Sequence, residues 1–214
     1  MHASELKSLL KAQADAIPEP GRVRLHRAIS WLARAEQESE DLDARFIFLW
    51  IAFNAAYAKQ FGFESTERET LQTFISRLVE VDSEKKLNAA VFRQFTGPIR
   101  VLIENKFVFE PFWKALRDHD ASDRWKTLFL ESSQRAMAAV MGGRTEVVLA
   151  IVFERLYVLR NQLVHGGATW NSQVNRGQVS DGARILGTLV PIIIGLMIEH
   201  SELDFGETLY PVVK

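Results

Sequence analysis

Residues 145–164 read TEVVLAIVFERLYVLRNQLV, a long helical stretch that is apolar on nearly every side. A helix of this sequence carries apolar side chains on nearly every side, from Val147 through Leu156 to Leu163. It has too little polar surface to lie against water, so it must sit at the centre of a bundle or pack against a second subunit as well. Gly166 and Gly167 predict its end, because glycine readily takes the left-handed conformation that terminates a helix.

Helical periodicity recurs outside this stretch, and strand signals are scarce, which predicts an all-α fold. Aromatic side chains at Phe46, Trp50, Phe53 and Tyr57 follow one another at helical spacing and indicate a core-facing stripe. Besides 145–164, the sequence predicts long helices over 22–39, over 42–61, and from Ser180 or Asp181 to about His200 with a kink at Pro191.

Residues 62–143 differ from the rest of the chain, because they contain shorter amphipathic pieces and more charge. Breaks at Gly97-Pro98, Glu110-Pro111 and Gly142-Gly143 divide them. We expect an inserted group of short helices within a single domain that spans residues 1–214. Ser122 and Asp123 are expected to cap a helix through about Val140, and Thr145 to cap the next one.

The composition excludes several classes of protein. The chain has 214 residues, of which 47% are hydrophobic and 25% charged, as in ordinary globular proteins. It has no cysteine, which rules out disulfides, thiol nucleophiles and thiolate metal sites. The formal net charge of −1 provides no overall attraction to nucleic acid, so RNA or DNA binding would need a local patch.

The sequence favours a cytoplasmic protein with no membrane segment. Its first residues lack the apolar run of a secretion signal. The two most apolar segments, 46–58 and 185–198, fall short of the roughly 20 residues needed to cross a bilayer, and we interpret both as buried helices.

One group of polar residues stands out at the end of helix 145–164. Arg160, Asn161 and His165 follow a long apolar stretch and precede the glycine pair. At about 100° per residue, Asn161 and His165 project about 40° apart and Arg160 about 140° from His165, so one broad arc holds all three. We interpret them as a candidate catalytic site; the alternative is that basic residues here complement the helix dipole.

The stretch Arg160-Asn161-Gln162-Leu163-Val164-His165 resembles the motif of the HEPN superfamily. In that motif an arginine, commonly followed by Asn, Asp or His, precedes a histidine by four to six intervening residues. Residues 46–57 also resemble the aromatic-rich helix of longer, stand-alone HEPN proteins. The likeness covers the two long N-terminal helices and residues 145–200, and it leaves 62–143 unmatched.

The resemblance implies a four-helix core that forms a homodimer in which the two motifs face each other. It also implies metal-independent RNA cleavage without a cofactor. His165 would act as general base or acid on the ribose 2′-hydroxyl and the leaving 5′-oxygen, and Arg160 would hold the scissile phosphate. Asn161 would orient either group or bind the phosphate. Because the 2′-hydroxyl is required, RNA is the expected substrate, and the products would be a 2′,3′-cyclic phosphate and a 5′-hydroxyl.

An endoribonuclease of this kind suits a role as a toxin, in antiviral defence or in RNA processing, with an antitoxin or other protein as a possible partner. The alternative is a non-catalytic HEPN module that binds RNA, a nucleotide or a protein, and a third hypothesis is a dimeric structural protein. Trp170 is either a base-stacking platform or a loop anchor. An RNA-facing patch is also predicted from the arginines that flank the motif, namely Arg144, Arg155, Arg160, Arg176 and Arg184.

Overall fold

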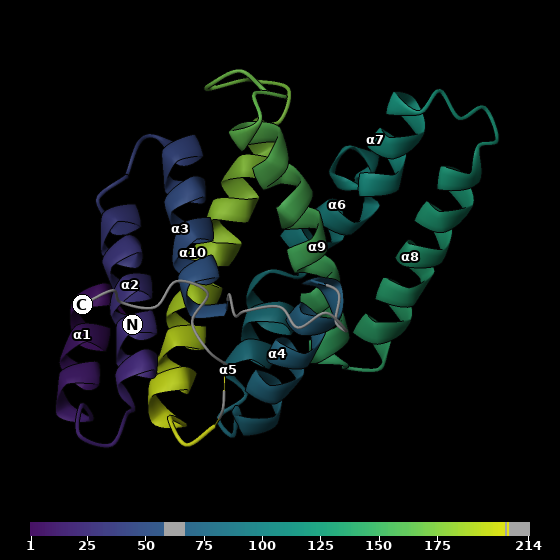
Figure 1. The fold of residues 1–214 in the computed structure, drawn as a ribbon. Helices are drawn as coiled ribbons and strands as arrows, with labels where there is room; N and C mark the ends of the chain where they lie inside the picture. The colour runs from purple at the N-terminus through teal and green to yellow at the C-terminus, as the bar shows by residue number, and fades with distance from the viewer. Residues whose placement is uncertain (58–66, 204, 206–214) are drawn as a thin grey trace.

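The computed structural model describes residues 1–57, 67–203 and 205, and every regular element in this part of the chain is a helix (Figure 1). The predicted all-α class is therefore confirmed. The longer helices are α1 (Ala3–Ala12), α2 (Glu19–Glu36), α3 (Leu42–Tyr57), α4 (Glu67–Val81), α8 (Arg124–Met141), α9 (Thr145–Val164) and α10 (Arg176–Glu199). The shorter ones are α5 (Lys86–Ala89), the π-helix η1 (Ala90–Gln94), α6 (Thr96–Glu104), the 3-10 helix η2 (Lys106–Val108) and α7 (Glu110–Arg117).

The helices form three groups around α9. Helices α1, α2, α3 and α10 pack side by side, with α2 and α10 both against α3. Helix α4 lies against α9 and α10, and helices α6 to α8 lie on another side of α9 (Figure 1). The loop that joins α9 to α10 and the loop that joins α2 to α3 lie at the same end of the molecule, which becomes important for the candidate site.

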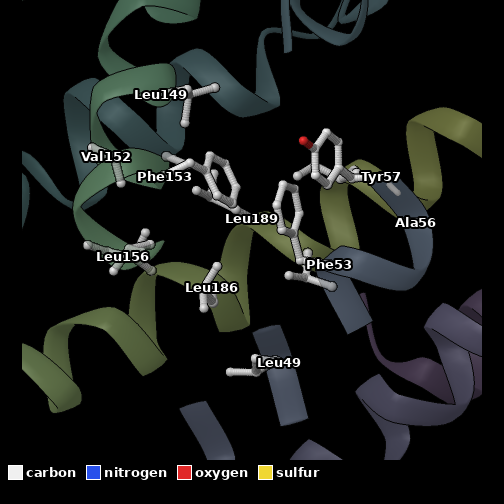
Figure 2. Packing of buried hydrophobic residues seen from close by; sticks show 14 of the residues in the cluster. Leu49, Phe53, Ala56, Tyr57, Leu149, Val152, Phe153, Leu156, Leu186 and Leu189 are labelled. Atoms are coloured by element: carbon white, nitrogen blue, oxygen red, sulfur yellow. The ribbon is translucent and has the colours of Figure 1, made fainter. Parts of the chain in front are cut away.

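Helix α9 has the bounds that the sequence predicts and is central in the fold. Its buried residues fall on all sides of the helix, because α3, α4, α6, α8 and α10 all contact it. Figure 2 shows Phe153 of α9 facing Phe53 of α3, with Tyr57 beside Phe53. The rings of Phe53 and Phe153 are stacked with their centroids 4.2 Å apart, and Phe53 and Tyr57 are stacked at 5.2 Å. The predicted aromatic stripe of α3 is thus part of the core.

Several predicted helix ends are wrong. Helix α2 begins at Glu19 instead of residue 22, because Pro20 is tolerated in the first turn of a helix. Helix α10 begins at Arg176 instead of residue 180 or 181, and it continues through Pro191. The extra first turn is held by Arg176, whose guanidinium is bound by Asp43 of α3. Residues 58–61 of the predicted second helix lie outside the described residues.

Of the predicted caps of α8 and α9, only Ser122 binds the start of its helix: its hydroxyl accepts a hydrogen bond from the backbone amide of Arg124 at 3.4 Å. Asp123 has a φ of 55° and makes no side-chain cap; its carboxylate accepts a hydrogen bond from the ammonium of Lys126 at 2.7 Å. Thr145 is the first residue of α9, and its hydroxyl accepts a hydrogen bond from the amide of Asn88 at 2.9 Å. Asp123 and Thr145 thus bind other side chains, and the general preference of Asp and Thr for helix N-termini does not predict these partners.

The segment between α3 and α9 consists of one part that packs in the core and another that packs outside it. Helix α4 supplies Phe74, Ile75 and Leu78 to the same buried cluster as α9 and α10. Helices α7 and α8 instead build a second aromatic cluster further out, in which the rings of Phe112 and Trp125 meet edge to face at 5.0 Å. The α7–α8 hairpin is therefore an outlying unit that touches the rest mainly through α9, η2 and α6.

Helix α10 is long and apolar enough to cross a membrane by its length and composition, and it is the one such helix in the described residues. However, 72% of its most apolar window is buried inside the protein. It is buried by α2, α3, α4 and α9, as expected for the core helix that the sequence analysis places at residues 185–198.

The close approach of α10 to α3 and α9 depends on Gly182. A Cβ atom added there would lie 2.8 Å from Cε2 of Phe46 and 3.1 Å from Cδ2 of Leu156. We expect Gly182→Ala to lower the free energy of unfolding by about 1–3 kcal/mol, because both neighbours are fully packed. Gly177→Ala is the matched control in the same helix, since nothing lies within 4 Å of its added Cβ. Urea unfolding followed by circular dichroism should show the control unchanged or slightly more stable; equal loss in both variants would contradict this packing.

Candidate active site

The three predicted site residues lie together at the C-terminal end of α9. Arg160 and Asn161 belong to its last turns, and His165 is the residue that follows the helix. The backbone amide of His165 still donates to the carbonyl of Asn161 at 3.0 Å, so the helical turn extends to the histidine. The imidazole is exposed, whereas Arg160 and Asn161 are half-buried.

The side chains of Arg160 and Asn161 are bound to each other. Nη1 of Arg160 donates to Oδ1 of Asn161 at 2.8 Å. Their neighbour Gln162 is turned toward the outer group of helices, where its amide nitrogen donates to the carbonyl of Phe107 at 2.6 Å. In the described part of the chain, neither Arg160 nor His165 has a carboxylate within 4.0 Å. The guanidinium of Arg160 therefore keeps its charge available for an anion.

The end of α9 closes as the glycine pair predicts. Gly166 has a φ of +70°, the left-handed conformation that glycine adopts at little cost. The amide of Ala168 then donates to the carbonyl of Gln162 at 3.1 Å, which satisfies one of the last carbonyls of the helix. This turn leads the chain away from His165 and leaves the imidazole at the surface.

The loop after His165 is held against the start of α3 by two aspartates. Oδ2 of Asp43 accepts hydrogen bonds from both terminal nitrogens of Arg176 at 2.9 Å and from the backbone amide of Asn171 at 3.1 Å. Oδ2 of Asp41 accepts from Nε1 of Trp170 at 3.0 Å. We name these five residues the loop latch. Because the latch joins α3, the loop and α10, it limits where the segment following His165 can move.

Trp170 shows features of both predicted roles. Its indole N–H is anchored to Asp41, yet the side chain is 75% exposed. An aromatic ring that is held by one edge and open to solvent on a loop next to the motif has the geometry of a stacking platform.

Three of the five arginines of the predicted patch are not available to it. Arg144 precedes the first turn of α9, about 24 Å along the helix from Arg160. Arg155 is 2% exposed and packs under the ring of Phe109, with 4.4 Å from its Cζ to the ring centroid. Arg176 is paired with Asp43 in the latch. Helix length removes Arg144 from the predicted patch, burial removes Arg155, and pairing with Asp43 removes Arg176.

A sizeable cavity lies elsewhere in the protein. It has a volume of about 620 Å³ and is lined by residues of α3, α4, α7, α8 and α9, but not by Arg160, Asn161 or His165. This cavity is not predicted from the sequence, whose one local signal is the charged pair Glu154-Arg155 in the middle of an apolar helix.

Within the described residues, no three His, Asp or Glu side chains lie close enough to hold a metal ion together. Compared with protein families, with curated proteins and with solved structures, the chain matches none of them.

The latch should contribute to stability through Asp43, which is buried and accepts three hydrogen bonds through one oxygen. We expect Asp43→Asn to lower the free energy of unfolding by about 2–3 kcal/mol, because it leaves the half-buried guanidinium of Arg176 without its counter-charge. The control is Asp181→Asn, whose carboxylate lies 3.7 Å from the exposed Arg184 and should matter by less than about 0.5 kcal/mol. Denaturant unfolding measures both, and a loss at Asp43 no larger than at Asp181 would contradict the latch.

The same latch should respond to acid through Asp41. The backbone amide of Ala44, and then the indole of Trp170, hold the pKa of Asp41 below the usual value for an aspartic acid, about 3.9. A lowered folded-state pKa means that the stabilisation is complete above the usual value and is lost as the pH falls through the lower one. Unfolding curves between pH 6 and pH 2 should therefore lose less stability for Asp41→Asn than for the wild type. Parallel curves for the two proteins would show that this carboxylate is not coupled to folding.

Proposed function

We propose that this protein is a metal-independent endoribonuclease that acts as a homodimer in the cytoplasm, as HEPN-like proteins do. The observation that carries the proposal is the grouping of Arg160, Asn161 and His165 at one solvent-exposed helix end, without a neighbouring carboxylate in the described residues. A guanidinium and an imidazole beside each other are the groups needed to hold a phosphodiester and transfer its protons.

The chemistry follows from the properties of the three side chains. His165 takes the proton of the ribose 2′-hydroxyl, whose oxygen attacks the adjacent phosphorus, and the P–O5′ bond breaks. A second imidazole returns a proton to the leaving oxygen. Arg160 binds the phosphate oxygens and stabilises the charge of the transition state, while its hydrogen bond to Asn161 keeps the guanidinium in place.

A dimer supplies the second imidazole. Each subunit offers one histidine at this helix end, since His200 follows the far end of α10, about 36 Å from its first turn. The motif also lies on an exposed surface outside the main cavity. A two-fold contact at the end of α9 would bring two copies of the motif together and enclose the phosphate between them.

The test is cleavage of a labelled single-stranded RNA, and of its DNA counterpart, in excess chelator. We expect the RNA to be cut to a 2′,3′-cyclic phosphate and the DNA to stay intact. His165→Ala and Arg160→Ala should each lower the cleavage rate by about 100-fold or more. His26→Ala and Arg124→Ala, at exposed positions away from the motif, serve as matched controls. Intact RNA with the wild-type protein, or equal cleavage by His165→Ala, would rule out the enzyme.

A second candidate function is binding of RNA without cleavage. It is favoured by the imidazole of His165, which no side chain of the described residues holds in a fixed orientation, whereas catalytic histidines are usually oriented by a hydrogen bond. Salt-dependent RNA binding that requires Arg160 but leaves the RNA intact would identify this function. A toxin, defence or RNA-processing role with a protein partner is compatible with either candidate.

A further inference from the structure

The cavity of about 620 Å³ lies between the core and the α7–α8 hairpin. Its volume of about 620 Å³ is within the range of pockets that bind small molecules. On the core side the wall is aromatic, with Trp50, Phe53, Tyr57, Phe153 and Tyr157 among its residues. On the hairpin side the wall consists of the start of α7 and one face of α8. The cavity thus has a rigid apolar wall and an outer wall from a separate unit of the fold.

The aromatic wall is well ordered by its own packing. Trp50 contacts Tyr157 with 6.1 Å between the ring centroids, and Phe53 stacks on Phe153. Trp50 is 5% exposed, and its indole N–H has no acceptor among the described residues. A buried donor without an acceptor is unfavourable, so a hydrogen-bond acceptor brought to this wall would be stabilised.

The charge buried in the cavity wall is positive. Arg155 is 2% exposed, its guanidinium packs over the rings of Phe109 and Phe129, and Nη2 donates to the hydroxyl of Ser132 at 3.0 Å. These contacts hold the guanidinium in one plane and one position. Arg135, one turn along α8 from Ser132, adds a second cation to the lining.

The cavity lining also contains three carboxylates, those of Glu110, Glu131 and Glu154. Glu110 and Glu131 are exposed, and Glu110 is paired with Arg117 at 2.8 Å, while Glu154 is engaged in an interaction of its own. Glu154 is half-buried and Arg135 is exposed, so Arg155, which also has a further interaction of its own, is the one charged side chain of this lining that is buried. Low solvent exposure strengthens the electrostatic interactions of that guanidinium.

We propose that this cavity is a binding site for a small aromatic carboxylate. The ring system would lie against Trp50 and Phe53, and the carboxylate would bind Arg155 and Arg135. A planar guanidinium matches the geometry of a carboxylate, and aromatic walls favour a flat apolar body. This site does not involve the α9 motif, so it stands or falls independently of RNA cleavage.

The test compares two probes of nearly equal shape, 2-naphthoate and 2-naphthylmethanol, by isothermal titration calorimetry with the full-length protein. We expect 2-naphthoate to saturate one site per chain and to bind about tenfold or more tightly than the uncharged alcohol. Equal affinities would overturn the assignment of an anionic ligand, and absence of saturable binding for both probes would overturn the site.

Matched variants of α8 locate the binding. Leu128 lines the cavity, whereas Leu130 lies on the outer face of the same helix and is 58% exposed. We expect Leu128→Trp to weaken 2-naphthoate binding by about tenfold or more by filling the cavity, and Leu130→Trp to leave it unchanged. Arg135→Gln should weaken it about threefold, with Arg124→Gln as the control outside the lining. Circular dichroism checks that each variant is folded, and equal effects within either pair would place the binding elsewhere.

Discussion

The structure depends on covering α9 on every side. Exposing any face of this helix to water would be unfavourable, so other helices must surround it. Its buried residues include Val148, Ile151, Phe153, Leu156 and Leu159. Helices α3 and α10 cover one part, α4 another, and α6 and α8 the rest. The close contact with α10 is possible because Gly182 leaves room for Phe46 and Leu156. Most of the chain can be understood as the cover that this one helix requires.

The same constraint decides where chemistry can occur on α9. Its polar residues can lie at its ends, which the surrounding helices do not cover, or in the middle, where neighbouring side chains must contact them. Arg160, Asn161 and His165 are the first case, at the end where the latch from α3 fixes the following loop. Arg155 is the second case, because two aromatic rings and Ser132 surround its guanidinium. The two proposed sites thus arise from one helix but face different surroundings.

The α7–α8 hairpin supplies the outer wall of the cavity, which the core helices alone do not enclose. It is fastened by α9, η2 and α6 and holds an aromatic cluster of its own around Phe112 and Trp125. The hairpin stands away from the aromatic wall formed by α3 and α9, and the space between them is the cavity. A small molecule in that space would contact both units and so connect the hairpin to the core.

The sequence by itself determined the all-α class, the bounds and central place of α9, the aromatic stripe of α3 and the end of α9 at Gly166, because each follows from local periodicity or backbone preference. It also placed Arg160, Asn161 and His165 at one helix end. Tertiary structure alone decided the start of α10, which Asp43 extends by binding Arg176, and the separation of the flanking arginines. It also decided the cavity, whose lining residues come from helices far apart in the chain. Long-range contacts of this kind leave no periodic signal in the sequence, since they depend on how whole helices pack once they have formed.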